Sequence, residues 1–264
     1  MFITSKILRS PHAFATRRGG ISAHEHTSEL NLAFGRGDGD ETVLENLEIF
    51  ASRVGFDPKS IVSLPQIHSD KIFKVGRDDC GKGYYIRDGI DSGDGYITDE
   101  TGVTLGIKTA DCVPILIEAE KNGEIVAVGA LHAGWRGTVA GIAAKCIQML
   151  KAEYAVSPES IRVAIGPCIH KCCYEVGEDL RGEVERALGR DVAEKFVVPK
   201  DGEEGKYFCD LVGINRRLLL SCGVPEKNID SIDLCSCCHP GIFFSHRYSK
   251  GLRGTMLNVI FVQK

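Results

Sequence analysis

The sequence predicts a mixed α/β (α+β) fold, a single-domain layered sandwich with mixed sheets flanked by helices. Three observations support this prediction. Short apolar segments with strand character are interspersed with segments whose apolar residues recur at helical spacing. A hairpin signal at Lys121-Asn122-Gly123 does not fit a purely parallel βαβ series. No repeat, low-complexity tract or change of composition divides residues 1–264, so we expect one catalytic domain.

The elements are expected in the following order along the chain. Apolar residues recur every three or four positions over residues 42–55, 138–151, 178–188 and 210–221, which predicts four helices, the last with Asp210 as its N-cap. Short apolar runs predict strands over residues 61–64, 71–75, 103–108, 113–118, 124–132, 162–165, 229–234 and 256–262. The glycine- and aspartate-rich stretch 76–95 and the stretch 199–205 are expected to be loops.

Composition argues against several classes of protein. Hydrophobic residues make up 43% of the chain, enough for a sizeable core, and the net charge of -4 argues against general binding to nucleic acid or to membrane surfaces. No apolar run approaches the roughly 20 residues that span a bilayer, and the N-terminal segment contains no apolar signal core. We therefore expect a cytoplasmic protein without nucleic-acid or membrane partners, and the sequence predicts no particular oligomeric state.

Eleven cysteines is a high number for this length, and in the cytoplasm most are expected to be reduced. Six of them fall into two clusters, Cys168/Cys172/Cys173 and Cys235/Cys237/Cys238. The spacings C-x3-C-C and C-x-C-C differ from the standard zinc-ribbon pattern. A second metal site or a redox-sensitive patch fits such clusters, but we interpret them as reduced thiols near the cleft that are not required for zinc.

The predicted hairpin brings two metal-binding residue types together. If Asn122-Gly123 is a two-residue turn, Lys121 faces Glu124, and the same register places Val113 opposite His132, with Cys112 one position further along. Cys112 and His132 then meet at the open end of the hairpin, where neighbouring backbones are roughly 5 Å apart. Two such side chains can share a zinc ion at about 2.0–2.3 Å from each ligand atom.

His68 is the third candidate ligand. It lies in the segment PQIHSD (65–70), between two predicted strands, where a polar side chain can point into a cleft. Three protein ligands with an open fourth position are typical of catalytic zinc, which lowers the pKa of its bound water to about 7. The alternative is that Cys112 is a small core residue and that the histidines make ordinary hydrogen bonds.

Three segments carry a resemblance to a known family: 65–70 (PQIHSD), 108–116 (KTADCVPIL) and 131–138 (LHAGWRGT). Together they closely resemble the polyphenol oxidase (laccase-domain) family, whose members include purine nucleoside phosphorylases. Segments 29–33, 165–169, 173–176 and 243–247 agree with it, so the resemblance spans roughly residues 10–262.

The resemblance implies a zinc ion bound by His68, Cys112 and His132. It also implies phosphorolysis of adenosine, inosine and methylthioadenosine to free base and ribose-1-phosphate or its methylthio analogue, with adenosine deaminase activity, so the expected partners are purine nucleosides and phosphate. A copper-dependent polyphenol oxidase activity has also been ascribed to the family. Its fold resembles that of a toxin deamidase family, which implies a rival function in which Cys112 is a nucleophile for an amide and His132 its base.

Two arginines are candidates for binding phosphate. Arg136 precedes the helix expected from Thr138, where free N–H groups and the helix dipole favour an anion, and its guanidinium can bind phosphate with two hydrogen bonds. Arg247 is a second candidate. For Arg136 the alternative is an exposed side chain without such a role.

Three further residues are candidates for the active site. Asp111, next to Cys112, is expected to act as a general acid–base group or to orient a zinc-bound histidine. On a regular strand it would point away from Cys112, so this role requires a local break in the strand. Asn31 and Gln66 are candidates for hydrogen bonds to the ribose or the base, with turn formation as the alternative.

Copper chemistry is less well supported than zinc chemistry. Multicopper centres need many histidines, including His-x-His pairs. The chain has eight histidines, and its one alternating pair, His24 and His26, lies far in sequence from Cys112. A non-enzymatic zinc or redox protein is disfavoured by the open coordination position and the adjacent anion site.

Overall fold

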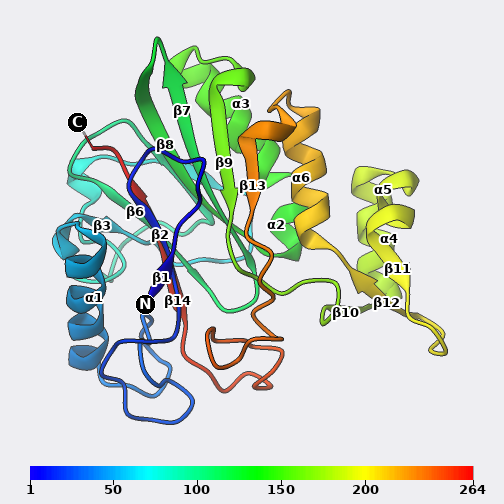
Figure 1. Cartoon of the computed structure of the whole chain (residues 1–264), viewed down its shortest axis with the longest axis horizontal. Helices are drawn as coiled ribbons and strands as arrows, with labels where there is room; N and C mark the ends of the chain where they lie inside the picture. The colour runs from blue at the N-terminus through cyan, green and yellow to red at the C-terminus, as the bar shows by residue number, and fades with distance from the viewer. Residues whose placement is uncertain (264) are drawn as a thin grey trace.

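Two large β-sheets pack face to face in the computed structural model, which describes residues 1–263 (Figure 1). The six-stranded sheet has the order β13 (Ile229–Ser231), β9 (Ile161–Ile165), β7 (Val113–Lys121), β8 (Glu124–Ala133), β5 (Gly95–Thr98) and β4 (Ile72–Lys74). The five-stranded sheet has the order β1 (Phe2–Ile3), β2 (His12–Ala15), β14 (Met256–Phe261), β6 (Thr104–Thr109) and β3 (Ile61–Val62). Both sheets mix parallel and antiparallel pairs. The predicted layered sandwich of mixed sheets is confirmed.

Alternation along the strands builds the two sides of each sheet. In β7, Ile115 and Ile117 belong to the core under the helices, whereas Leu116 belongs to the core between the sheets. In β14, Val259 packs toward the outer helix and Ile260 packs between the sheets. This period of two explains why apolar residues fill both faces of the central strands.

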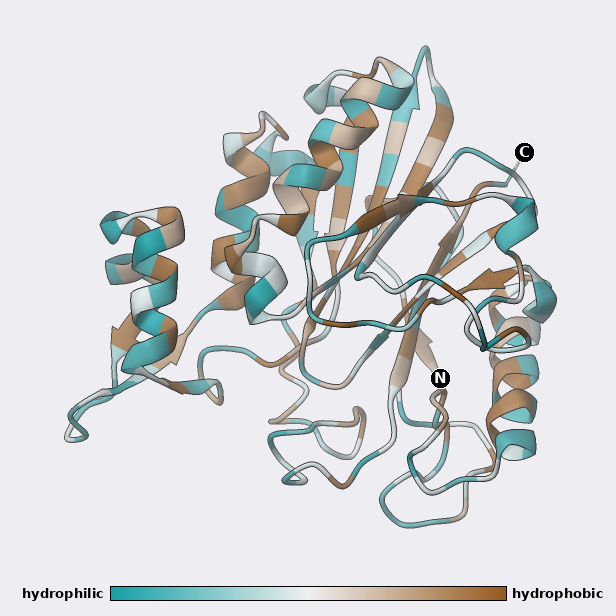
Figure 2. Cartoon of the chain, turned by 180° about the vertical axis from the view of Figure 1, so that it is seen from behind, coloured by the Kyte–Doolittle hydropathy of each residue, from teal (hydrophilic) through white to brown (hydrophobic). Residues whose placement is uncertain are grey.

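Helices cover the outer face of each large sheet. The helix α1 (Asp40–Val54) packs on the five-stranded sheet, and α2 (Trp135–Val139), α3 (Ile142–Tyr154) and α6 (Leu211–Ser221) pack on the six-stranded sheet (Figures 1 and 2). The helices α4 (Glu178–Leu188) and α5 (Arg190–Phe196) lie to one side with a third sheet of β10 (Glu175–Gly177), β12 (Lys206–Cys209) and β11 (Val197–Pro199). One-turn 3-10 helices occur at Pro58–Ser60, Arg77–Asp79, Pro158–Ser160 and Glu226–Asn228. None of the helices within residues 1–263 is long and apolar enough to cross a membrane.

The helix predicted over residues 138–151 is in fact two helices. Gly141 separates them with a φ of 78°, a left-handed conformation that ends α2 and lets α3 start in a new direction. The predicted cap is confirmed, because the Asp210 side chain accepts a hydrogen bond of 2.8 Å from the N–H of Gly213. The strands β1, β2, β5 and β10 to β12 were not predicted, because they are short and lack clear alternation.

The central hairpin contains one irregularity that the sequence does not reveal. Its turn is as predicted, with Lys121 opposite Glu124 and positive φ values at Asn122 and Gly123. The register then shifts by one residue beside Ala119, so that Pro114 and not Val113 lies opposite His132. The predicted partner of His132 is therefore wrong by one residue. Since residues directly opposite share a face, the shift moves His132 to the same side of the sheet as Cys112.

Candidate metal centre and active site

The three predicted ligands lie together where the hairpin opens. Cys112 immediately precedes β7, His132 lies near the end of β8, and His68 lies in the loop between β3 and β4. One ligand atom from each lies within 4.8 Å of the other two, and Cys112 Sγ is 3.9 Å from His68 Nε2. His132 is buried and His68 is exposed, so the group has one side toward the core and one toward solvent.

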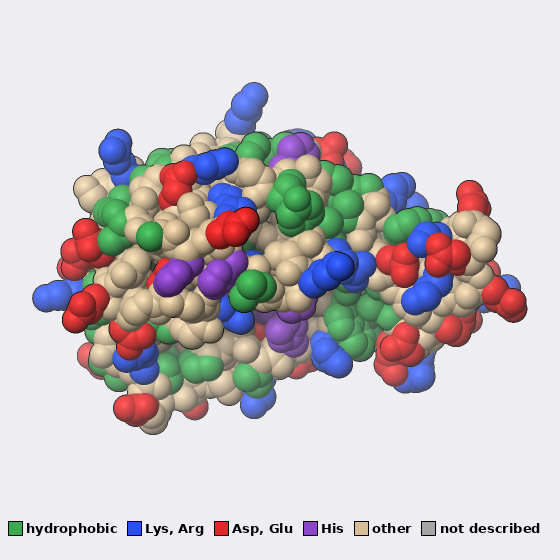
Figure 3. All heavy atoms as spheres, turned by 90° about the horizontal axis from the view of Figure 1, so that it is seen from below, with side chains coloured by type: hydrophobic (Ala, Val, Ile, Leu, Met, Phe, Trp, Pro, Cys, Tyr) green, Lys and Arg blue, Asp and Glu red, His purple; other side chains and the backbone are tan. Residues whose placement is uncertain are grey.

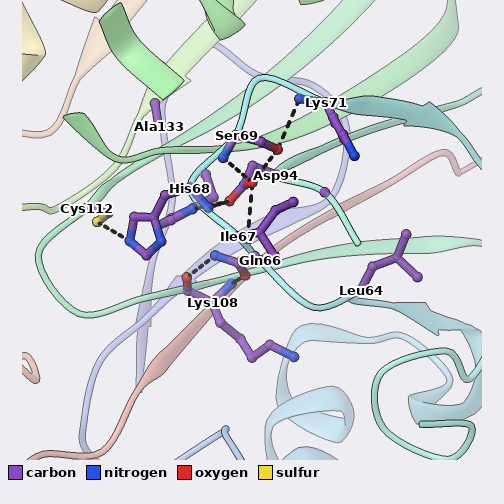
Figure 4. Close-up of polar contacts among 12 residues, drawn as sticks. Leu64, Gln66, Ile67, His68, Ser69, Lys71, Asp94, Lys108, Cys112 and Ala133 are labelled. Atoms are coloured by element: carbon purple, nitrogen blue, oxygen red, sulfur yellow. Dashed lines mark hydrogen bonds and ion pairs between the residues drawn. The ribbon is translucent and has the colours of Figure 1, made fainter. Parts of the chain in front are cut away.

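A buried carboxylate, Asp94, holds both histidines. Its Oδ1 accepts a hydrogen bond from Nδ1 of His132 at 2.7 Å. The same oxygen accepts the backbone N–H of His68 at 3.0 Å (Figure 4). Its Oδ2 accepts from the N–H and the hydroxyl of Ser69 at 2.6 and 2.7 Å. Because a carboxylate only accepts hydrogen bonds, Nδ1 of His132 carries a proton, and Nε2 is the ring nitrogen that faces Cys112. His68 has a φ of 59°, a conformation that this contact helps to hold.

Cys112, His132 and Asp94 shift one another's pKa. Burial acts to raise the pKa of Cys112, but the charge and hydrogen bond of His132, followed by those of His68, lower the pKa to about 6. Burial acts to lower the pKa of His132, but the Cys112 thiolate and the Asp94 carboxylate raise it to about 9. Burial also opposes the charge of Asp94, yet its hydrogen bonds with His132 and Ser69 hold its pKa at about 2. At neutral pH, without a cation, Cys112 is therefore a thiolate facing an imidazolium.

The donor set fits a zinc ion. One thiolate and two imidazoles are ligands that zinc prefers, and a carboxylate behind a ligating histidine is a recurrent feature of zinc sites. Gly134 leaves room for the group, since a Cβ there would lie 2.9 Å from Cδ2 of His68 and 3.3 Å from Sγ of Cys112. Two groups in residues 1–263 could hold a metal, and neither includes His24 or His26, the alternating pair that a multicopper centre would recruit.

A cavity of about 290 Å³ lies over the three ligands. His68, Cys112 and His132 line it together with three cationic side chains, Arg36, Lys108 and Arg253. The surrounding face of the molecule, where long loops gather, carries histidine side chains among basic, acidic and apolar ones (Figure 3). The cavity therefore combines a metal-binding group with a positively charged lining, which suits an anionic ligand.

Gln66 and Lys108 form one wall of this cavity. The Gln66 carboxamide makes two hydrogen bonds to the backbone of Lys108, donating to its C=O at 2.8 Å and accepting from its N–H at 2.7 Å (Figure 4). One N–H and one lone pair of Gln66 remain for a ligand. The Lys108 ammonium donates to the C=O of Ser63 and lies 4.9 Å from the centre of the Tyr84 ring. Burial lowers the pKa of Lys108 to about 8, so it is mostly cationic at neutral pH.

Arg253 has unused hydrogen-bond donors beside the cavity. Its Nη1 donates to the hydroxyl of Thr255 at 2.7 Å, whereas its Nε is buried without a partner among the described residues. Burial lowers the pKa of this guanidinium to about 10, so it stays charged. A buried guanidinium with an unpaired donor favours an anion.

Asp111 and Arg247 contact each other but do not line the cavity. Asp111 has a φ of 110°, the local break that its predicted role requires. Its carboxylate accepts hydrogen bonds from the Ser236 hydroxyl at 2.6 Å and from the N–H of Arg247 at 2.7 Å. The Arg247 guanidinium donates to the C=O groups of Cys173 and Glu175. Both residues therefore tie loops together next to Cys112.

Arg136 and Asn31 are also placed outside the cavity lining. Arg136 is exposed in the first turn of α2, and its guanidinium stacks 4.3 Å from the centre of the Trp135 ring. Asn31 is buried and uses its carboxamide within the protein: it bonds Ala33, Asp38 and the N–H of Thr255. Ala33 and Thr255 do line the cavity, so Asn31 supports its wall.

Sequence reasoning missed Asp94, Lys108 and Arg253. Lys108 stands directly before the TADC motif and could have been noticed there, because a lysine in a buried strand is unusual. Asp94 is one of several aspartates in a stretch predicted as loop, and nothing local distinguishes it. Arg253 lies more than 100 residues after His132, the last of the three metal ligands in the sequence, so only the fold brings it to the cavity.

Comparison with known proteins identifies the family of this chain. A family model described as multi-copper polyphenol oxidoreductase laccase matches residues 11–263. Purine nucleoside phosphorylase YlmD of Geobacillus stearothermophilus is 36% identical over 247 residues, 93% of this chain and 87% of that protein. Adenosine deaminase RL5, from an unknown prokaryotic organism, is 32% identical over 92% of this chain and 90% of its own. The crystal structure of G. stearothermophilus YlmD matches with a TM-score of 0.87 at 35% identity, over 96% of this chain and 92% of that one. The chain therefore belongs to the multi-copper polyphenol oxidoreductase laccase family.

Proposed function

We propose that this protein is a zinc-dependent purine nucleoside phosphorylase that also deaminates adenosine. Its substrates would be adenosine, inosine or methylthioadenosine together with phosphate, and its products the free base and ribose-1-phosphate or its methylthio analogue. The observation that carries the proposal is one cavity lined both by the three metal ligands and by Lys108 and Arg253. Relatives named purine nucleoside phosphorylase and adenosine deaminase support it.

Phosphorolysis requires an anion held beside the sugar. A phosphate oxygen forms a bond to C1′ of the ribose while the bond from C1′ to the purine nitrogen breaks, so the phosphate must be oriented toward C1′. Arg253 offers unpaired donors, and Lys108 and Arg36 add positive charge in the same cavity. The remaining N–H and lone pair of Gln66 can orient the ribose or the base.

The metal would contribute most directly to the deamination of adenosine. When bound by His68, Cys112 and His132, Zn²⁺ would act as a Lewis acid and lower the pKa of a bound water, the chemistry that deamination needs. Asp94 fixes the tautomer and the orientation of His132 and the backbone of His68. Asp111 keeps Cys112 in place through its contacts with Ser236 and Arg247.

The test combines metal content with product analysis. His68→Ala, Cys112→Ala and His132→Ala should each lower the zinc content by about one ion per chain. Wild-type protein should release adenine and ribose-1-phosphate from adenosine only when phosphate is present, and inosine without it. The control is Cys80→Ala, because Cys80 lies in neither group that could hold a metal. Full zinc retention in all three variants, or base release that does not need phosphate, would contradict the proposal. The same elemental analysis reports copper.

The contacts among Cys112, His132 and Asp94 favour a second candidate function, that of a thiol hydrolase. Cys112, His132 and Asp94 form a relay of a thiolate, an imidazolium and a carboxylate, with 2.7 Å between Nδ1 of His132 and Oδ1 of Asp94. This is the arrangement of a thiol hydrolase, in which the Cys112 thiolate bonds to the amide carbonyl carbon, the C–N bond breaks and the His132 imidazolium gives its proton to the leaving amine.

Alkylation separates the two functions of Cys112. A metal-bound thiolate should resist iodoacetamide until a chelator removes the metal, whereas a free nucleophile should react at once in protein as purified. Mass spectrometry of the peptide that contains Cys112 measures both. Rapid alkylation without chelator, with a covalent adduct formed on an amide substrate, would favour the hydrolase.

A further inference from the structure

A second group of sulfur atoms lies outside the cavity. Cys172 and Cys173 belong to the loop between β9 and β10, and Cys235 and Cys238 belong to the segment after β13. The four sulfurs all lie within 4.8 Å of one another. The two segments run side by side because Cys168 and Cys235 form a parallel β-bridge (Figure 1). The fold thus gathers four thiols from positions about 65 residues apart.

The distances among these sulfurs match those of a tetrahedral metal site. Sγ of Cys172 is 3.8 Å from that of Cys173 and 3.6 Å from that of Cys238, and the last two are 3.4 Å apart. Four sulfurs at about 2.3 Å from a zinc ion in tetrahedral geometry are separated from one another by roughly 3.8 Å. The sulfurs therefore lie close to ligand positions without a change in the backbone.

The structure also selects which cysteines take part. Cys237 and Cys168 are outside the group, so the second segment contributes Cys235 and Cys238, which have C-x2-C spacing. The C-x2-C spacing is typical of zinc ligands. It is not apparent when Cys235, Cys237 and Cys238 are read together as C-x-C-C. Cys235 lies in a turn closed by a hydrogen bond from the N–H of His239 to its C=O, as a loop that presents two sulfurs requires.

The surroundings favour a thiolate at Cys235 and offer a positive charge beside the group. The backbone N–H of His170 donates to Sγ of Cys235 at 3.4 Å, an interaction that stabilises a negatively charged sulfur. Zinc with four thiolates has a net charge of −2, and the Arg247 guanidinium lies next to the group, where it donates to the C=O of Cys173 at 3.1 Å. Arg247 therefore supplies positive charge where such a complex needs it.

We propose that Cys172, Cys173, Cys235 and Cys238 bind a second zinc ion, in a closed structural site distinct from the group formed by His68, Cys112 and His132. With four protein ligands the site has no open position for a substrate, so its role is to hold the chain. This inference does not depend on the proposed enzymatic activity. It replaces our interpretation of these thiols as free.

The site would fasten the loops that support Asp111. Ser236, which donates its hydroxyl to Asp111, lies between two of the ligands, and Arg247 links Cys173 to the other oxygen of Asp111. Because Asp111 adjoins Cys112, a zinc ion at the four cysteines fixes the backbone at the first site as well. Its loss should increase the mobility of residues 168–175 and 235–247.

The competing explanation is a disulfide. All eleven cysteines are free thiols in the structure, but Cys172 or Cys173 could be oxidised to a bond with Cys238, for which the sulfurs must approach to about 2.05 Å. A disulfide uses two of the four sulfurs, whereas zinc uses all four. This difference can be measured.

Metal analysis in a variant that lacks the first site tests the proposal. Cys112→Ala/His132→Ala protein, purified with reductant, should retain about one zinc per chain, whether or not the first site binds zinc in the wild type. Adding Cys172→Ser and Cys238→Ser should remove it, and adding Cys80→Ser or Cys237→Ser should not. Cobalt substitution should give intense thiolate-to-metal charge-transfer absorption and tetrahedral visible bands, which disappear in the same combination.

X-ray absorption at the zinc edge gives a readout that needs no change at the four cysteines. In the Cys112→Ala/His132→Ala protein it should show four sulfur neighbours at about 2.3 Å. Absence of zinc from this protein, a shell with nitrogen or oxygen neighbours, iron instead of zinc, or a disulfide found by alkylating the unfolded chain would each overturn the assignment. If the quadruple variant does not fold, this measurement alone decides.

Discussion

The Oδ1 atom of Asp94 lies 2.7 Å from Nδ1 of His132, and the same oxygen accepts the backbone N–H of His68. One buried carboxylate thus positions two of the three ligands, although they come from a loop and from β8. This contact makes the geometry of the site depend on a residue that cannot itself reach the metal position.

Asp94→Asn should weaken zinc binding roughly 10- to 100-fold, because the amide cannot replace a carboxylate that accepts five hydrogen bonds. Competition with a chromophoric chelator measures the affinity. Asp70→Asn is the matched control, since Asp70 lies in the loop that contains His68 but pairs with Lys145. Equal affinity of Asp94→Asn and wild type would show that the carboxylate does not support the metal.

Gly134→Ala should also reduce zinc binding while the chain stays folded. The new methyl group would lie 2.9 Å from Cδ2 of His68, so the imidazole must move away from the other ligands. Circular dichroism and zinc content measure the two effects. Gly182→Ala in α4 is the control, because a Cβ there meets no atom within 4 Å, and it should keep its zinc. An unchanged zinc content in Gly134→Ala would mean that His68 is not a ligand.

The two candidate phosphate residues make opposite predictions. Arg253→Ala should lower ribose-1-phosphate formation about 10²- to 10³-fold, because it removes a charged donor beside the substrate. Arg136, the phosphate ligand that the sequence predicts, stacks on Trp135 outside the cavity lining, and Arg136→Ala should have less effect. Product analysis at varied phosphate compares the two, with deamination as the internal control. A larger loss in Arg136→Ala would restore the original assignment.

Phosphate binding should weaken at alkaline pH because of Lys108. Burial lowers its pKa from 10.5 to about 8, so the side chain is cationic below pH 8 and becomes neutral as the pH rises through that value. The KM for phosphate should then rise roughly 10- to 100-fold, the effect of losing one charged hydrogen bond. Arg253, with a pKa of about 10, stays charged there, and Tyr84, whose pKa is raised by burial, stays neutral. Lys108→Arg should remove the alkaline rise, and its persistence in that variant would assign it to another group.

The sequence predicted those parts of the molecule that local signals determine. Asn122-Gly123 fixes the turn, the apolar period fixes α1, α4 and α6, and the ends of the hairpin bring Cys112 near His132. It did not predict contacts between distant segments. Asp94 meets His132 from 38 residues away, and Cys172 meets Cys238 from 66 residues away. Nothing in either local sequence indicates these pairs, because they arise from how the sheets and loops pack.

A bulge of one residue in β8 puts His132 on the same face of the sheet as Cys112. Cys112 lies nine positions from Lys121 and His132 lies eight from Glu124, an odd difference that would put the two side chains on opposite faces of a regular ladder. The shift beside Ala119 takes up one residue of β8 and so restores a common face. Lengthening the turn at Asn122 should therefore be harmless. Deleting Val126, the residue without a partner in this register, would remove the bulge, keep Pro114 opposite His132 and leave the imidazole on the side of Cys112. A chain shortened by one residue there should therefore keep both its fold and its metal site.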